Sequence, residues 1–313
     1  MEEKQIRRKM RINIGSYGWA LLIYYFLMNV CVSTAMTLEM IFQMIGSLGT
    51  GEIDSQALLG NGGGYLIACL MAVLFIRLWK GKAFFGGMWQ AERDMTPGAF
   101  FTLVCLFISG QLLFQVFAAI LETVLNLFGF SALESMELAT VSTDTISMFL
   151  YTSLAAPIVE EIIFRGLVLR GLEGYGKRFA VLASAVLFGL FHGNVVQSPY
   201  AFAVGLVLGY TAVEYNIGWA MVLHMINNLL LGDTIPRLTQ GLGEFGASLV
   251  LQGIILVCSI GAAVSLIRKR KEIGAWLRGA PGNRPAWRAF WTAPGILAMV
   301  IVMGLSALSM LTR

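Results

Sequence analysis

Long apolar runs separated by short polar segments dominate the pattern of hydrophobic and polar positions. A transmembrane helix needs roughly 17–25 mainly apolar residues, and most of these runs are about that long or longer. The pattern therefore predicts an all-α protein, a bundle of about eight or nine transmembrane spans in one integral membrane domain over residues 1–313. The nine candidate spans are residues 16–45, 63–79, 98–129, 146–171, 179–194, 199–213, 217–232, 245–267 and 290–311.

The composition narrows the class of protein further. Hydrophobic residues make up 57% of the chain and charged residues only 13%, against about 25% charged residues in a soluble domain. This excludes a disordered chain, a nucleic-acid binder built on basic patches and an ordinary cytosolic enzyme. The cysteines all lie inside apolar runs, so we interpret them as small core residues and not as disulfide or zinc ligands. They are Cys31, Cys69, Cys105 and Cys258.

The placement of charge predicts the orientation in the membrane. Of the 22 lysines and arginines, 19 fall in the N-terminal segment or in the second, fourth and eighth loops. Nine alternating spans put all of these on one face, and cytoplasmic loops collect Lys and Arg. We therefore expect a cytoplasmic N-terminus, an uncleaved first span and a bacterial plasma membrane. Two loops of the other face carry only acids, namely Glu52, Asp54, Glu134, Glu137 and Asp144.

Ionisable side chains inside spans are the candidates for function, because each costs about 2.5–3.5 kcal/mol on insertion scales. We expect Glu39 and Glu122, in the outer parts of their spans, to be interfacial or paired structural acids. The other five lie on spans four, five and seven, between residues 160 and 224, and we expect these three spans to surround a polar catalytic cavity. The full set is Glu39, Glu122, Glu160, Glu161, Arg165, His192 and His224.

Span four combines two carboxylates with an arginine. Glu161 and Arg165 are four residues apart and share a helix face, so they can form an ion pair. Glu160 lies about 100° further round the helix and is free to face a hydrated cavity. Pro157 begins or kinks a helix here. Either one glutamate is structural and the other chemical, or all three charges form a packing network.

The two histidines of the chain both lie in spans downstream of this pair. Phe188 and His192 share one helix face, and His224 shares another with Asn228, while Asn227 is less well placed. A carboxylate and an imidazole can activate a water molecule, and a second imidazole and a carboxamide can stabilise an oxyanion. Alternatively, Glu160, His192 and His224 hold a zinc ion that activates the water.

The three segments resemble the motifs of the CPBP family of intramembrane endopeptidases, which includes the type II CAAX prenyl endopeptidases and Abi-like bacteriocin-processing proteins. The motifs are Glu160-Glu161-x-x-x-Arg165, Phe188-x-x-x-His192 and His224-x-x-x-Asn228, and the resemblance covers a catalytic core at about residues 145–232. It implies that Glu160 activates water with His192, that His224 and Asn228 form the oxyanion site, and that Glu161 and Arg165 hold the geometry.

The resemblance implies an endopeptidase that cleaves a membrane-associated or lipidated protein or peptide, with no specificity for a prenyl group carried over. Family members have been described as metalloproteases and as glutamic proteases. Because Asn228 is a poor zinc ligand, we favour a mechanism without a cofactor, with zinc or another divalent metal as the alternative. The expected partners are membrane lipids and the substrate peptide, not nucleic acid. A membrane scaffold or bacteriocin immunity protein, and less strongly a proton-coupled transporter, are the competing functions.

Overall fold

A computed structural model describes residues 2–46, 54, 58, 60–133, 145–278 and 283–312. Apart from an isolated antiparallel bridge between Ser131 and Thr312, these residues form helices, turns and short connections, as the all-α prediction requires. The acids Glu52, Glu134, Glu137 and Asp144 lie outside the described residues. The elements relevant to the fold are α1 (Glu2–Gly46), α3 (Gly63–Lys80), α4 (Lys82–Gly87), α5 (Pro97–Leu127), α10 (Lys177–Phe191), α11 (Gln197–Glu214), α12 (Ile217–Ile226), α14 (Gly243–Arg268), α15 (Arg270–Arg278), α16 (Arg284–Thr292) and α17 (Pro294–Ser309).

Two of the predicted spans are helical throughout but change helix type along their length. The fourth consists of α7 (Ile146–Leu150), η1 (Tyr151–Ala155), α8 (Ala156–Glu161), η2 (Ile162–Leu169), α9 (Arg170–Leu172) and η3 (Glu173–Tyr175). The seventh continues from α12 through η4 (Asn227–Thr234), α13 (Ile235–Thr239) and η5 (Gln240–Leu242). Of these, η1, η2 and η4 are π-helical.

Fewer spans than the predicted eight or nine are found when the helices are judged by length and hydropathy. Within the described residues, five helices are long and apolar enough to cross a membrane, or up to six if α16 and α17, bent by 59°, count as one span. With 15 residues, α10 is shorter than a helix needs to cross a bilayer, about 20 residues. The protein is thus an integral membrane protein by the character of its helices, and the predicted count of eight or nine is not confirmed.

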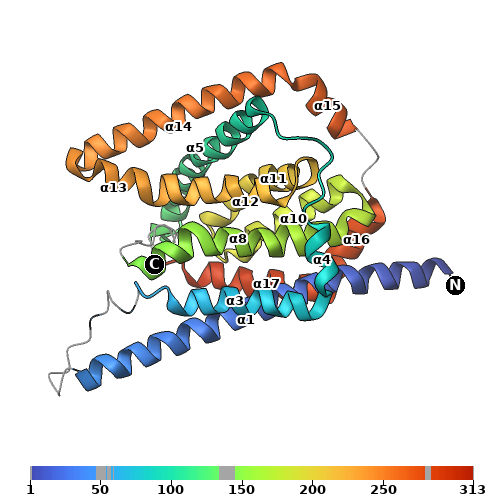
Figure 1. The fold of residues 1–313 in the computed structure, drawn as a ribbon, viewed down its shortest axis with the longest axis horizontal. Helices are drawn as coiled ribbons and strands as arrows, with labels where there is room; N and C mark the ends of the chain where they lie inside the picture. The colour runs from blue at the N-terminus through green and yellow to red at the C-terminus, as the bar shows by residue number, and fades with distance from the viewer. Residues whose placement is uncertain are drawn as a thin grey trace.

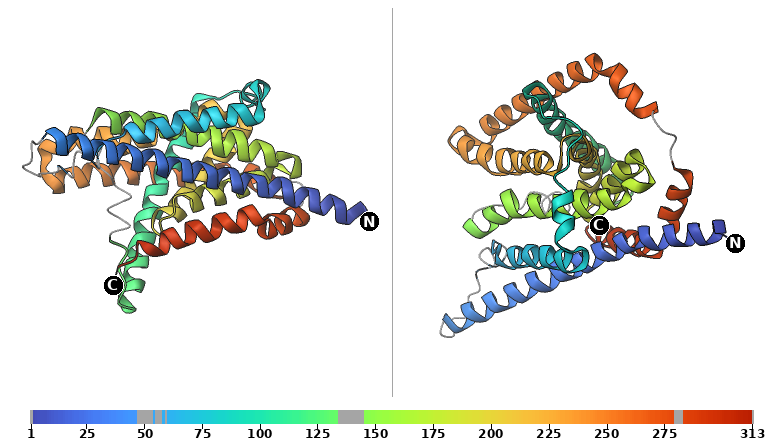
Figure 2. Two further views of the ribbon diagram at one scale, coloured as in Figure 1. Left: turned by 90° about the horizontal axis from the view of Figure 1, so that it is seen from below. Right: turned by 45° about the vertical axis from the view of Figure 1, so that its right-hand side comes forward.

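The helices form a central group flanked on two sides. In Figure 1 the group of α8, α10, α11 and α12 lies between α1, α3 and α17 on one side and α5 and α14 on the other. The N-terminus, α4 and α16 lie toward one end of the bundle in Figure 1 and in the left view of Figure 2. The basic segments predicted to be cytoplasmic therefore gather at a common end.

Polar contacts tie the loop before α5 to this basic end. The guanidinium of Arg93 pairs with the carboxylate of Glu214, and the backbone N–H groups of Glu92 and Arg93 donate to the Glu214 carbonyl at 3.1 and 3.0 Å. Burial lowers the pKa of Arg93, but the neighbouring Glu214 carboxylate, together with Tyr210 and Tyr215, outweighs this effect and raises the pKa above its ordinary value.

The acids at the other end have structural partners. Glu122 accepts hydrogen bonds from the Ser131 hydroxyl at 2.8 Å and from the Ala132 N–H at 2.7 Å. Glu39 is approached by the side-chain amides of Gln43 and Asn61, each at 3.5 Å. Both glutamates therefore have the polar partners that the prediction of paired structural acids requires.

Glycines allow α1 and α17 to cross at backbone contact. A Cβ atom at Gly18 would lie 2.4 Å from the Gly295 carbonyl, and one at Gly295 would lie 2.1 Å from the Gly15 carbonyl oxygen. Small residues that let backbones approach are typical of membrane helix interfaces. This crossing holds α17 against the core, where Ile296 and Met299 are fully buried.

We expect Gly295→Ala to destabilise the protein by about 1–3 kcal/mol, because the added methyl group forces two backbones apart. Gly304→Ala on the same helix is the matched control, since a Cβ there meets no atom within 4 Å. Thermal unfolding of the two purified variants in detergent measures the difference. Equal unfolding temperatures would show that the α1–α17 crossing is not closely packed.

Candidate active site

Two prolines determine the local backbone around the motif residues. Pro157 and Pro236 each occupy the second position of an α-helical segment, α8 and α13, and a π-helical segment precedes each one. Proline lacks an N–H and clashes with the carbonyl four residues earlier, so the preceding turn widens. Widened turns of this kind occur frequently at functional sites.

The widened turn leaves one carbonyl group without a helical partner. In the π register the Ala156 N–H donates to the Tyr151 carbonyl, so the Thr152 carbonyl would pair with the nitrogen of Pro157, which has no hydrogen. Instead it accepts a hydrogen bond of 2.9 Å from Nδ2 of Asn228 on η4. Because Pro157 has no N–H, the Thr152 carbonyl of span four is free to accept a hydrogen bond from Asn228 of span seven.

The two glutamates of α8 have different environments, as their positions on the helix predict. Glu161 is fully buried, and its Oε1 accepts a hydrogen bond of 3.1 Å from Nη1 of the fully buried Arg165. Nη2 of Arg165 donates to the Gly205 carbonyl at 3.2 Å. The side chain of Glu160 is 19% exposed, and it accepts no hydrogen bond from the described residues. Glu161 therefore belongs to a closed ion pair, whereas Glu160 is open to a small ligand such as water.

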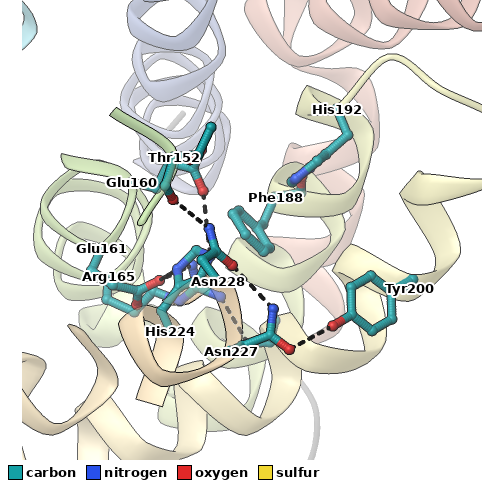
Figure 3. Close-up of polar contacts among 11 residues, drawn as sticks. Thr152, Glu160, Glu161, Arg165, Phe188, His192, Tyr200, His224, Asn227 and Asn228 are labelled. Carbon is teal, nitrogen blue, oxygen red and sulfur yellow. Dashed lines mark hydrogen bonds and ion pairs between the residues drawn. The ribbon is translucent and has the colours of Figure 1, made fainter. Parts of the chain in front are cut away.

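His224 connects the two glutamates. Its Nδ1 donates to Oε1 of Glu161 at 2.9 Å, while its Nε2 lies 3.8 Å from Oε2 of Glu160. Figure 3 shows His224 between Arg165 and the amide of Asn228. The carboxylate of Glu161 thus accepts from both Arg165 and His224, and this orients the second imidazole nitrogen toward Glu160.

His192 lies at the end of α10, because Gly193 adopts a left-handed conformation with φ of 55° and ends the helix there. Its Nδ1 donates to the Phe188 carbonyl at 2.8 Å, which leaves Nε2 as an acceptor. The ring of Phe188 meets His192 edge-on at 4.9 Å and His224 at 5.9 Å, centroid to centroid. His192 does not contact Glu160, although the two lie within electrostatic range.

Phe188 therefore does more than fill space between the histidines. The guanidinium carbon of Arg165 lies 4.4 Å from the centroid of its ring. A cation over an aromatic face is stabilised by the quadrupole of the ring. Phe188 thus supports the buried arginine while keeping the two imidazoles apart.

Asn228 is part of a hydrogen-bonded series that the motifs did not include. Nε2 of Gln111 donates to the Tyr200 hydroxyl at 2.8 Å, and the hydroxyl donates to Oδ1 of Asn227 at 3.1 Å. Nδ2 of Asn227 donates to Oδ1 of Asn228 at 3.0 Å. The only signal for these residues in the sequence is that they are polar in apolar runs.

The side chains around Glu160 do not form a metal site in this geometry. Among the described residues, no three His, Cys, Asp or Glu side chains are arranged to hold a metal ion. The alternative zinc set of Glu160, His192 and His224 is therefore not supported.

The surroundings of Glu160 toward α1 and α3 are aromatic and apolar. Tyr24, Cys69 and Tyr151 lie within electrostatic range of its carboxylate. Tyr24 also lines a cavity of about 220 Å³ between α1, α3 and η2, to which Ile163 and Leu167 of η2 contribute as well. The predicted polar cavity between spans four, five and seven stays a prediction.

Comparison with known proteins agrees with the motifs. Residues 142–230 match the family model described as type II CAAX prenyl endopeptidase Rce1-like. The search of curated proteins found no match, and neither did the search of solved structures. The matched segment contains all three motifs, so the resemblance to the CPBP and CAAX protease family is confirmed over residues 142–230.

Proposed function

We propose that the protein is an intramembrane endopeptidase that hydrolyses a peptide bond of a membrane-associated or lipidated protein or peptide. The observation that carries this proposal is the contrast between the two neighbouring glutamates. Glu161 is fully buried and paired, whereas Glu160 is partly exposed and faces Nε2 of His224 at 3.8 Å. The family match supplies the reaction class.

In the proposed mechanism the carboxylate of Glu160 removes a proton from a water molecule held between it and His192. The resulting hydroxide attacks the carbonyl carbon of the scissile bond, so that the oxygen becomes an oxyanion. Nδ2 of Asn228 has a second N–H, and His224 lies beside it; both can donate to this oxyanion. The tetrahedral intermediate then collapses, the C–N bond breaks, and Glu160 returns its proton to the leaving amine.

The proposed role of Glu161 and Arg165 is to position His224. Donation through both nitrogens of His224 requires the imidazolium form, which Glu161 pairs with at Nδ1 and Glu160 faces at Nε2. Pairing of opposite charges offsets part of the cost of burying them, although Oε2 of Glu161 and Nε of Arg165 have no hydrogen-bond partner among the described residues. An imidazolium fixed in this way can donate through Nε2 to an oxyanion near Glu160.

We propose that this chemistry proceeds without a metal ion, because the remaining polar group of the site, the Asn228 carboxamide, is a poor zinc ligand and a good oxyanion donor. The identity of the substrate is a separate proposal. The name of the matched family refers to prenylated CAAX proteins, and the test below therefore includes both lipidated and unmodified peptides.

We further propose a bacterial plasma membrane with the N-terminus in the cytoplasm, based on the 19 basic residues that alternate with acidic loops. In a variant without native cysteines, Leu242→Cys should react with a membrane-impermeant maleimide added to intact cells. Lys82→Cys on α4 should react only after the cells are opened. Labelling of Lys82→Cys, and not of Leu242→Cys, in intact cells would show that the orientation is the reverse of the one proposed.

Glu160→Gln should lower kcat by at least about 100-fold, because the amide cannot accept the proton of water. The assay uses purified protein and a panel of internally quenched peptides, with a farnesylated Cys-aliphatic-aliphatic-X peptide, its unmodified counterpart and a transmembrane peptide. Glu39→Gln is the matched control, an acid in a span whose partners lie outside the site.

The outcomes distinguish the competing functions. The control should cleave like the wild type, and a chelator such as EDTA should leave cleavage unchanged. Full activity of Glu160→Gln would remove Glu160 as the base, and loss of activity in EDTA that zinc restores would contradict the metal-free mechanism. A scaffold or a transporter predicts no cleavage of any peptide by the wild-type protein.

A further inference from the structure

Asn228 can stabilise an oxyanion only if its carboxamide is oriented with nitrogen, and not oxygen, toward the reacting carbonyl. The two ends of a carboxamide have nearly the same shape, so packing alone does not select between them, and hydrogen bonds determine the orientation. A flipped amide would present oxygen lone pairs to a developing negative charge. The groups that prevent this flip therefore contribute to the proposed reaction.

The Thr152 carbonyl can only accept, and the side chains behind Asn228 add hydrogen bonds that reinforce the same orientation of its amide. The Gln111 amide donates to the Tyr200 oxygen, so the single hydroxyl proton of Tyr200 is directed to Oδ1 of Asn227. With its oxygen engaged there, Asn227 can offer only N–H to Asn228. Asn228 must then place Oδ1 toward Asn227 and Nδ2 toward the Thr152 carbonyl and the site.

The geometry in Figure 3 agrees with this order of contacts, from Tyr200 through Asn227 to the amide of Asn228 beside Thr152 and Glu160. One N–H of Asn228 Nδ2 is used by the Thr152 carbonyl. The other has no acceptor in the part of the chain that the structure describes. An unpaired amide N–H beside Glu160 is the group that the oxyanion requires.

The fold brings Tyr200 into place from a third helix. Tyr200 lies on α11, Gln111 on α5 and Asn227 on η4. Gly110, next to Gln111, permits this approach, since a Cβ there would lie 3.2 Å from Cε2 of the Tyr200 ring. The ring is also held by Phe114, with 5.5 Å between centroids, so removal of the hydroxyl alone should leave the ring in position.

We propose that Tyr200 is a positioning residue, which acts through Asn227 to hold the Asn228 carboxamide with its free N–H toward the scissile carbonyl. This inference rests on the proposed peptidase function and deepens it. Tyr200 touches neither the substrate nor the water molecule in this proposal. In this proposal the Tyr200 hydroxyl affects the reaction only by orienting the Asn228 carboxamide.

The test is a double-mutant cycle measured with the peptide of the panel that the wild-type protein cleaves fastest. Tyr200→Phe should lower kcat by about 10- to 100-fold and leave KM within about twofold, since the amide acts on the oxyanion and not on the bound substrate. In the Asn228→Ala background, Tyr200→Phe should have no further effect on kcat. Tyr210→Phe, on the same helix and outside this series, is the matched control.

A purely structural role of Tyr200 would give a different pattern. The loss would then persist in the Asn228→Ala background and would accompany a lower unfolding temperature, which overturns the proposal. Wild-type kcat in Tyr200→Phe also overturns it while leaving the proposed function intact. If Tyr200→Phe does not fold, Asn227→Ala takes its place in the same cycle, and additive losses there reject the proposal. Absence of cleavage by the wild-type protein would overturn both proposals.

Discussion

The buried contact between Glu161, Arg165 and His224 is the constraint on which the rest of the site depends. A fully buried arginine requires a charged partner, and Glu161 supplies it at 3.1 Å while accepting from His224 at 2.9 Å. The hydrogen bond between Glu161 and His224 thereby joins spans four and seven. The second hydrogen bond of Arg165, to the Gly205 carbonyl, adds α11. The ion pair of Glu161 with Arg165 offsets their buried charges, and the hydrogen bond of the same carboxylate to His224 determines where Nε2 of His224 lies.

Proline chemistry complements this electrostatic constraint. Pro157 frees the Thr152 carbonyl, which accepts from Asn228, and Pro236 follows the π-helical segment that carries Asn227 and Asn228. Spans four and seven therefore meet twice, through a charged contact at Glu161 and a neutral one at Thr152. Glu160 lies between the two contacts in sequence, partly exposed, which is where a water-activating carboxylate is needed in the proposed mechanism.

The sequence predicts these contacts only where they follow from helical spacing. Glu161 and Arg165 pair as their separation by four residues indicates, and Glu160 faces away from them. The relation of His192 to Glu160 could not be predicted, because it depends on where Gly193 ends α10. Gln111, Tyr200 and Asn227 were missed as partners of Asn228, since their contacts join three helices and leave no spacing pattern. The predicted span count is not confirmed for a related reason: α10 is apolar and largely buried in protein, and burial in protein and in lipid select the same residues.

The measurement that tests the central claim most directly separates the stability of the buried cluster from its role in catalysis. Arg165→Met alone leaves Glu161 as an unpaired buried charge and should destabilise the protein by about 3–5 kcal/mol. Glu161→Leu combined with Arg165→Met removes both charges and should recover most of the thermal stability. The account predicts that this stable double variant still fails to cleave peptide, because His224 has lost the carboxylate that orients it. A double variant that is both stable and as active as the wild type would contradict the account.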